Sequence, residues 1–331
     1  MFVLYEHPSL SYSKNEWGDW MLVKPPKLQR GDTVGIIAPA SPPNRHDLQQ
    51  GIVYLEKLGL RVKVGQNVDK EYGYLAGNDD ERVADIHSMF ADQEIKAIFS
   101  ARGGYGTGRI ADKIDYQLIQ QNPKIFWGYS DLTFLHTAIR QNSNLVTFHG
   151  PMVASEMGKI SWDSLSDQFV QQLFNTDSIV YDERIAPIET PITGYCKGRI
   201  VGGNLCLLAT TIGTAFEIDT KDKILLIEDI HEEPRAIDRL LNQLLMTGKL
   251  SELKGLIIGD FTECNPSNRQ GTLSLEEVLQ HYVTIINKPT LKGIKIGHCS
   301  PHVSIPLGTM AILDASRKTL TIESGVSDCQ C

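Results

Sequence analysis

A serine stands where a short apolar run gives way to helical spacing in KIFWGYSDLTFLH, residues 124–136. Ser130 could serve the backbone, because a serine oxygen before a helix accepts a hydrogen bond from an unpaired N–H of the first turn. It could also serve chemistry, as a nucleophile that a base activates and a carboxylate orients through that base. Both roles stay open at this point, and the second requires a histidine and an acidic residue at other strand ends.

Two of the nine histidines end apolar segments that we predict to be strands. His298 ends GIKIGHC, residues 293–299, and we predict it to be the base, because ligands and reacting groups gather beyond the carboxyl ends of strands in α/β sheets. His149 ends another predicted strand and is expected to line the pocket. His302 follows His298 by four residues, but Pro301 blocks the helix that would bring both rings to one metal ion.

Two carboxylates, Glu228 and Asp229, close the apolar run KILLIEDI, residues 223–230. A buried carboxylate is costly unless it is paired or hydrogen-bonded, so this pair could supply the acid that orients the base. The alternative is an interaction with the N-terminal end of the helix that begins at Pro234. His231 and Glu232 stand close by, but no HExxH or comparable metal spacing appears, and we predict no metal and no cofactor.

The segment SARGGYGTGRI, residues 100–110, suggests a nucleotide loop but fails the two spacings that define one. A dinucleotide fingerprint from Gly104 would need its third glycine at Arg109, and a P-loop from Gly103 would need Lys followed by Ser or Thr after Gly108. Two interpretations remain. The loop is a tight turn that needs positive φ, or its backbone N–H groups form an oxyanion hole beside Ser130.

The elements that must position these residues alternate between apolar runs and helical spacing from Thr33 onward. Such alternation is typical of a parallel sheet with helices on both faces, whose ligand site lies beyond the carboxyl ends of the strands. We expect the loops at those ends to converge. They are residues 39–41, 102–104, 129–131 and 149–151.

A polar stretch between Pro151 and Pro191 interrupts the alternation, with one predicted helix at residues 163–174, and a second α/β block follows. The predicted fold class is therefore α/β with two domains. The first is a flavodoxin- or Rossmann-like parallel-sheet sandwich, and the second is smaller and has a mixed sheet. The predicted boundaries are an N-terminal extension at 1–23, a first domain at 24–155, a connection at 156–190 and a second domain at 191–331.

The composition narrows the class of protein. A net charge of −8 argues against a nucleic-acid partner, and 41% apolar with 22% charged residues is typical of a globular domain. No run reaches the roughly 18 apolar residues of a membrane span, and the start lacks a secretory signal, so we predict a cytoplasmic protein without a membrane partner. The six cysteines form no close CxxC pair, and we expect reduced thiols.

Several motifs taken together resemble the LD-carboxypeptidase family, the S66 serine peptidases, from about Lys24 to Asp314. They occur in the family's order: GDTVGIIAPASP, ARGGYG, FWGYSDLT, TFHGPM, GRIVGGNL, LLIEDIHEEPRAIDRLLNQL and IGHCSPH. The resemblance implies a Ser-Glu-His triad on a two-domain fold, with the nucleophile in the first domain and the acid and base in the second. GYSDL is not the G-x-S-x-G elbow of α/β-hydrolases, because position 132 is Leu.

Carried over by motif, the resemblance makes Ser130 the nucleophile, Glu228 the acid and His298 the base. It assigns the oxyanion hole to the backbone N–H groups of Gly104 and Asp131. It also implies a small peptide substrate, a cytoplasmic murein tetrapeptide from which terminal D-alanine is released during cell-wall recycling, and a homodimer. The free carboxylate of such a substrate requires a cationic or polar clamp. The candidate substrate-binding residues are Arg102, Gly103, His149 and Asn204, the last in the turn Gly202-Gly203-Asn204.

Two alternatives remain. Relatives that hydrolyse microcin-type peptide nucleotides share the triad and stack an aromatic residue on the nucleobase, and Trp162 in the connecting segment could take that place or could pack on the core. The two-domain layout would also suit a binding module that closes on a small molecule without chemistry.

Overall fold

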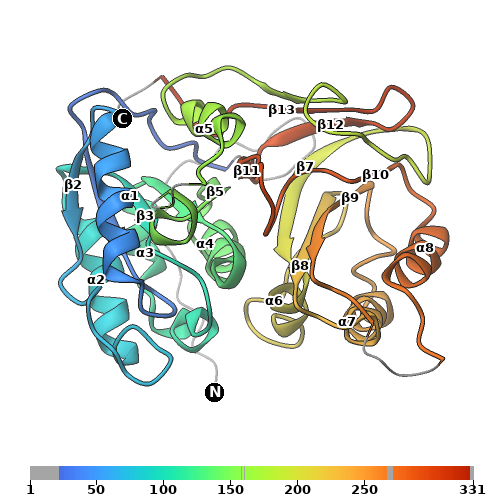
Figure 1. Ribbon diagram of the computed structural model, residues 1–331, viewed down its shortest axis with the longest axis horizontal. Helices are drawn as coiled ribbons and strands as arrows, with labels where there is room; N and C mark the ends of the chain where they lie inside the picture. Colours follow the sequence, from blue (N-terminus) through green and yellow to red (C-terminus); the bar gives the residue numbers. More distant parts are fainter. Residues whose placement is uncertain (1–21, 158, 160, 267–270, 329–331) are drawn as a thin grey trace.

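The computed structural model describes residues 22–157, 159, 161–266 and 271–328. Two sheets lie beside each other, each with helices packed on it, and form two lobes that meet at the centre of the molecule (Figure 1). The predicted fold class, a two-domain α/β protein, is confirmed. Most of the predicted N-terminal extension lies outside the described residues, as do Cys329 and Cys331.

The first lobe is built on a six-stranded sheet in the order β11-β5-β4-β3-β1-β2. Its strands are almost wholly apolar and buried, except for the exposed edge strand β2, as expected for a sheet covered on both faces. Five strands run parallel, and β11 pairs antiparallel with β5 at the other edge. The strands are β1 (Thr33–Ile37), β2 (Arg61–Val64), β3 (Ile95–Ser100), β4 (Ile125–Gly128), β5 (Thr147–His149) and β11 (Ile305–Leu307).

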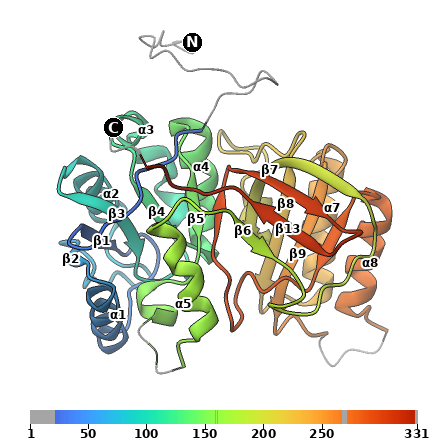
Figure 2. The ribbon, with the colours of Figure 1, turned by 90° about the horizontal axis from the view of Figure 1, so that it is seen from above.

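Helices cover both faces of this sheet and enclose two apolar clusters (Figure 2). Helix α1 (Arg45–Lys57) and helix α5 (Ser164–Val170) pack on one face. On the other face lie α2 (Asp79–Ala91), α3 (Tyr116–Gln121) and α4 (Thr133–Ser143).

The second lobe has a seven-stranded mixed sheet in the order β10-β9-β8-β7-β12-β13-β6. The first four strands are parallel and the last three antiparallel. The strands are β6 (Ile179–Tyr181), β7 (Tyr195–Asn204), β8 (Ile224–Ile230), β9 (Gly255–Thr262), β10 (Thr290–Lys292), β12 (Met310–Asp314) and β13 (Thr319–Ile322). Helices α6 (Leu205–Thr210), α7 (Pro234–Met246) and α8 (Leu275–Ile286) pack against one face of this sheet.

The two lobes contact each other at several places in the described structure, and two of these involve the backbone of β11 and that of Asn204. Strand β11, from the late part of the chain, joins the first sheet through the pairs Ile305–His149 and Leu307–Thr147. At the other place, the backbone N–H of Asn204 donates to Thr133 Oγ1 at 3.0 Å. A Cβ on Gly203, whose φ is +139°, would lie 2.5 Å from that same oxygen, so only glycine allows this close approach.

Two predicted elements differ from the structure. The strand predicted at residues 293–299 is wrong, because only β10 is extended and the chain then turns irregularly at Gly293 and Gly297, with φ of +85° and +121°. The helix predicted at residues 163–174 is α-helical only in α5 and ends in the 3-10 turn Gln171–Leu173. The predicted domain boundaries stay a prediction.

Candidate active site

Ser130 lies in a sharp turn between β4 and α4. Its φ is +63°, a left-handed conformation that costs a non-glycine residue of the order of 1–3 kcal/mol. The residue opens the 3-10 turn Ser130–Leu132, and neither this turn nor α4 has a side-chain cap at its start. The role of Ser130 as a helix cap is therefore not observed, and its hydroxyl is directed to the other lobe.

The carboxylate of Glu228 lies at the end of β8, where the register with β9 shifts between Ile227 and Asp229. Its side chain is fully buried, and Glu228 Oε2 lies 2.8 Å from His298 Nδ1. A Cβ on Gly297 would lie 2.7 Å from this oxygen, and one on Gly259 would lie 3.2 Å from Glu228 Cβ. The two glycines thus leave the space in which the carboxylate reaches the imidazole.

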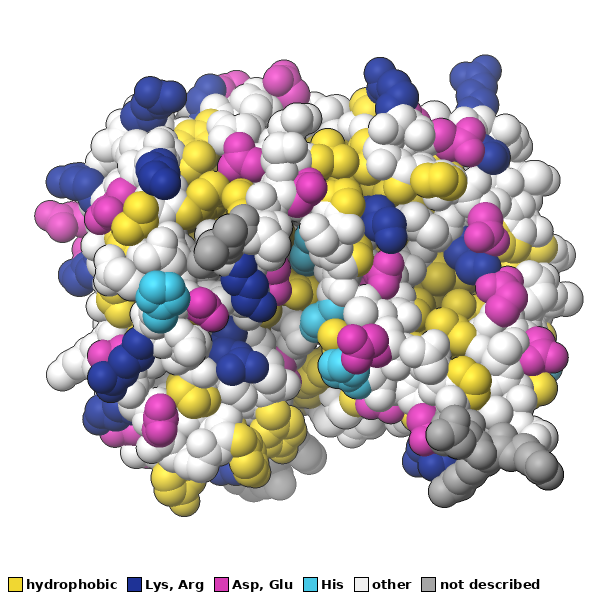
Figure 3. Space-filling model, viewed as in Figure 1, with side chains coloured by type: hydrophobic (Ala, Val, Ile, Leu, Met, Phe, Trp, Pro, Cys, Tyr) yellow, Lys and Arg dark blue, Asp and Glu magenta, His cyan; other side chains and the backbone are white. Residues whose placement is uncertain are grey.

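His298, which belongs to the second lobe, is hydrogen-bonded to Ser130 of the first lobe. Its Nε2 lies 3.0 Å from Ser130 Oγ, so serine, imidazole and carboxylate form one hydrogen-bonded series without movement of either lobe. Burial disfavours the imidazolium, but the hydrogen bond to Glu228 and its negative charge outweigh that effect and hold the pKa of His298 above its ordinary value. Figure 3 shows histidine side chains gathered on the boundary between the lobes.

Tyr129, the residue before the serine, forms the wall on which the imidazole packs. Its ring centroid lies 4.7 Å from that of His298 and 4.6 Å from that of His302. Burial raises the pKa of Tyr129 well above its ordinary value, so its hydroxyl stays protonated and donates to Glu156 Oε1 at 2.8 Å. The aromatic ring therefore holds the position of the imidazole from one side.

The glycine loop approaches the serine closely. A Cβ on Gly103 would lie 3.0 Å from Ser130 Cβ, and Gly104 has φ of +114°. Ser41 fixes the loop, since its N–H donates to Gly103 O and its Oγ accepts from Tyr105 N. Gly103 is thus held beside Ser130, and Gly104 is the next residue of the loop.

The remaining predicted substrate-binding residues are dispersed. Arg102 is exposed, and its Nη1 lies 3.4 Å from Pro42 O. His149 is fully buried with its ring 5.4 Å from that of Tyr129, so it lies behind the site. Asn204 caps α6 through Oδ1 and donates through Nδ2 to Asp229 Oδ1 at 2.9 Å. Neither His149 nor Asn204 lines the cavity beside His298, because His149 is enclosed in the interior and the side chain of Asn204 is hydrogen-bonded within the second lobe.

A cavity of about 360 Å³ opens beside His298. It is bounded by the carboxyl ends of β4 and β8, the connecting segment and the residues that follow His298. Its lining is Tyr129, Ser155, Glu156, Lys159, Ser161, Trp162, Asp163, Ser166, Ile230, His298, Cys299, Ser300 and His302. Trp162 also packs edge-on against Tyr54 at 5.3 Å, so it belongs to the core and to the cavity wall together.

Sequence reasoning missed Glu156 and Lys159, which it placed in a polar connection. Glu156 is presented by the π-helical turn Val153–Met157, a rare conformation that concentrates at functional sites and that no spacing in the sequence indicated. The only signal was their position just after TFHGPM, a motif at a predicted strand end.

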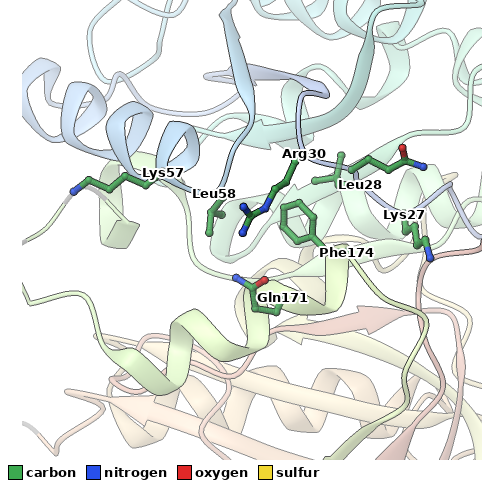
Figure 4. A pocket seen from close by; sticks show the side chains of 8 residues that line it. Lys27, Leu28, Arg30, Lys57, Leu58, Gln171 and Phe174 are labelled. Carbon is green, nitrogen blue, oxygen red and sulfur yellow. The ribbon is translucent and has the colours of Figure 1, made fainter.

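A second cavity, of about 450 Å³, lies on the first lobe beside the end of α1 (Figure 4). Its lining includes Lys57, Arg30 and Phe174 and none of the three residues of the hydrogen-bonded series. No group of three or more metal-ligating side chains occurs among the described residues. No helix among the residues that the structure describes is both long enough and apolar enough to cross a membrane.

An alcohol, an imidazole and a carboxylate in hydrogen-bonded series are the arrangement that serine hydrolases use, here set between two α/β lobes. The chain belongs to the LD-carboxypeptidase family, as the sequence motifs predicted, and is a serine carboxypeptidase. The model of the LD-carboxypeptidase N-terminal domain matches residues 34–150, and that of the C-terminal domain matches residues 197–313.

The chain is similar in sequence or in structure to several known proteins, including the three that follow. A probable murein peptide carboxypeptidase of Bacillus subtilis is 52% identical over 305 residues, covering 92% of this chain and 96% of that protein. The crystal structure of muramoyltetrapeptide carboxypeptidase from Oxalobacter formigenes superposes with a TM-score of 0.80 at 28% identity, over 89% of this chain and all of that one. The microcin C7 self-immunity protein MccF of Escherichia coli is 28% identical, over 89% of this chain and 94% of its own.

Proposed function

We propose that the protein hydrolyses the amide bond between the L-centre of a diamino acid and the terminal D-alanine of a murein tetrapeptide. The proposed reaction takes place in the cytoplasm and is a step of cell-wall recycling. The observation that carries the proposal is the series Ser130–His298–Glu228, with 3.0 Å and 2.8 Å between its members. The murein peptide substrates of the similar enzymes support the choice of peptide.

In the proposed reaction, Ser130 Oγ attacks the scissile carbonyl while His298 Nε2 takes the hydroxyl proton. Glu228 stabilises the imidazolium that forms, and the N–H groups of Gly104 and Asp131 donate to the oxyanion. His298 then gives its proton to the departing amine of D-alanine and leaves an acyl-enzyme. Water, deprotonated by His298, attacks the ester, releases the shortened peptide and restores the serine hydroxyl.

The experiment is to incubate the purified protein with an L,D-tetrapeptide and to follow free D-alanine and tripeptide by mass spectrometry. We expect turnover by the natural protein and a loss on the order of 10³-fold or more in Ser130→Ala, with the fold retained. Normal activity of the Ser130→Ala protein would refute the proposed mechanism.

A second candidate substrate is a peptidyl or aminoacyl nucleotide conjugate. Two observations favour testing it: Trp162 in the wall of the cavity beside His298, and the similarity to MccF. The same assay, run with acyl-nucleotide conjugates in place of the tetrapeptide, decides between the two. We expect the tetrapeptide to have the larger kcat/KM, and the reverse order would make the conjugates the substrate.

A further inference from the structure

The cavity beside His298 lies on the side of the reaction where the leaving residue must be. In a serine hydrolase the imidazole that takes the serine proton later gives it to the leaving amine. If the protein acts as proposed above, the D-alanine being released therefore lies against His298 and in this cavity. What the cavity offers to that residue can be worked out from its free polar groups.

The carboxylates in the wall are largely committed to donors of the protein itself. Glu156 Oε2 accepts from Met152 N at 2.6 Å, and its Oε1 accepts from the hydroxyl of Tyr129. Asp163 Oδ1 caps α5, accepting from Leu165 N at 2.8 Å. Acceptors are thus mostly satisfied within the wall.

The donors, in contrast, are free. His302 is 2% exposed, and neither of its ring nitrogens has a hydrogen-bond partner among the described residues. Burial lowers the pKa of His302 to about 3, so the ring is neutral and carries one N–H donor. A buried donor without a partner carries a desolvation cost that an acceptor on a ligand would offset.

Other donors face the same space. The hydroxyls of Ser155, Ser161 and Ser300 and the ammonium of Lys159 line the cavity, and the charge of Lys159 acts on the nearby carboxylate of Glu156. Lys159 also brings a positive charge to a wall that contains two carboxylates. A cavity with free donors, a cation and occupied acceptors is suited to an anion that bears several acceptor lone pairs.

We propose that this cavity binds the free α-carboxylate of the leaving residue, with Lys159 and His302 as specificity-determining residues. The clamp that the sequence placed at Arg102 and Asn204 thus lies instead on the connecting segment and the loop after His298. Such a clamp restricts cleavage to the C-terminal residue of the peptide. Within a longer chain, a peptide bond takes the place of the terminal carboxylate and offers no negative charge to Lys159.

The test compares two tetrapeptides that differ only at the C-terminus, one with a free carboxylate and one with a carboxamide. We expect the natural protein to prefer the carboxylate. Lys159→Met and His302→Phe should each lower kcat/KM for the carboxylate about 10- to 100-fold, chiefly through KM, and change it less than about threefold for the amide. Lys57→Met, which alters an exposed lysine of the second cavity, is the matched control and should leave both values unchanged.

Binding to the Ser130→Ala protein, measured by calorimetry, gives a readout without turnover. The carboxylate peptide should bind more tightly than the amide, and Lys159→Met should abolish the difference. His302 is buried, so if its variant fails to fold, the exposed Lys159 carries the test alone.

Cleavage of both peptides at equal rates, or an unchanged preference in Lys159→Met, would overturn the inference and leave the proposed function standing. Failure of the natural protein to cleave either peptide would instead refute the proposed function, and this inference with it.

Discussion

Replacing Glu228 by Gln tests the electrostatic logic of the hydrogen-bonded series. The substitution keeps the size of the side chain and removes one buried negative charge, 2.8 Å from His298 Nδ1. At an effective dielectric constant of about 20, a charge pair about 4 Å apart is worth about 4 kcal/mol, and a hydrogen bond to a charged group about 1.5–3 kcal/mol. A loss of about 3–4 kcal/mol from the imidazolium-like transition state lowers kcat about 10²- to 10³-fold.

The pH profile gives the sharper readout. Activity requires neutral His298, so kcat/KM falls as the pH drops through the pKa of that imidazole in the free enzyme. Glu228 holds this pKa above its ordinary value against the opposing effect of burial. In Glu228→Gln burial is opposed only by the charges of Glu156 and Asp229, so the pKa of His298 falls and the acid limb moves to lower pH. A limb that stays in place, or that moves to higher pH, would refute the reasoning.

Asp229→Asn is the matched control. Its carboxylate makes no hydrogen bond to His298 and accepts instead from Asn204 Nδ2, Cys206 N and Ile230 N, each at 2.9 Å. Its charge has a smaller effect on the pKa of His298 than that of Glu228. Burial raises the pKa of Asp229 to about 6, so it titrates in the same range as a histidine. We expect this variant to keep the acid limb in place and kcat within a few-fold. A shift of the acid limb as large as that in Glu228→Gln would mean that the limb does not report the ionisation of His298.

Three further predictions concern local structure. Gly297→Ala would place a Cβ 2.7 Å from Glu228 Oε2 at a φ of +121°, and we expect kcat to fall at least tenfold, by displacement of the carboxylate; unchanged kinetics would contradict the crowding argument. Burial raises the pKa of Asp131 from 3.8 to about 6, so the folded state binds an extra proton between these values and loses stability as the pH rises through them. Asp131→Asn should therefore gain up to about 3 kcal/mol relative to the natural protein between pH 4 and pH 7 in urea unfolding, and a pH-independent difference would refute it. Asn78→Ala removes the capping box with Glu81 and should lower the unfolding free energy by about 1 kcal/mol without changing kcat, both measured on the same preparation.

The strand ends that carry the chemistry could be predicted because they follow simple rules. Buried apolar runs ending in Gly-Tyr-Ser and Ile-Glu-Asp have few structural interpretations, and both runs are strands in the structure, β4 and β8. The sequence alone left open whether Ser130 caps a helix and whether Glu228 or Asp229 faces the base. Those choices depend on the turn at Ser130 and on the register shift in β8, which arise from packing between distant segments.

The features that the sequence did not predict also depend on packing between segments that are distant in the chain. The segment before His298 has the alternation of a strand, but Gly293 and Gly297 allow it to turn and fold over Glu228. The prediction that Asn204 binds substrate stays a prediction, and in the structure its amide donates to Asp229 within the second lobe. The π-helical turn that presents Glu156 has no sequence pattern of its own.

Trapping the nucleophile tests the central claim most directly. The natural protein, treated with a serine-directed phosphonate, should gain the mass of one adduct, and peptide mapping should place it on Ser130. The His298→Ala protein should label far more slowly, because nothing then takes the hydroxyl proton. Absence of an adduct from a protein that cleaves the tetrapeptide, or an adduct on a different residue, would contradict the account.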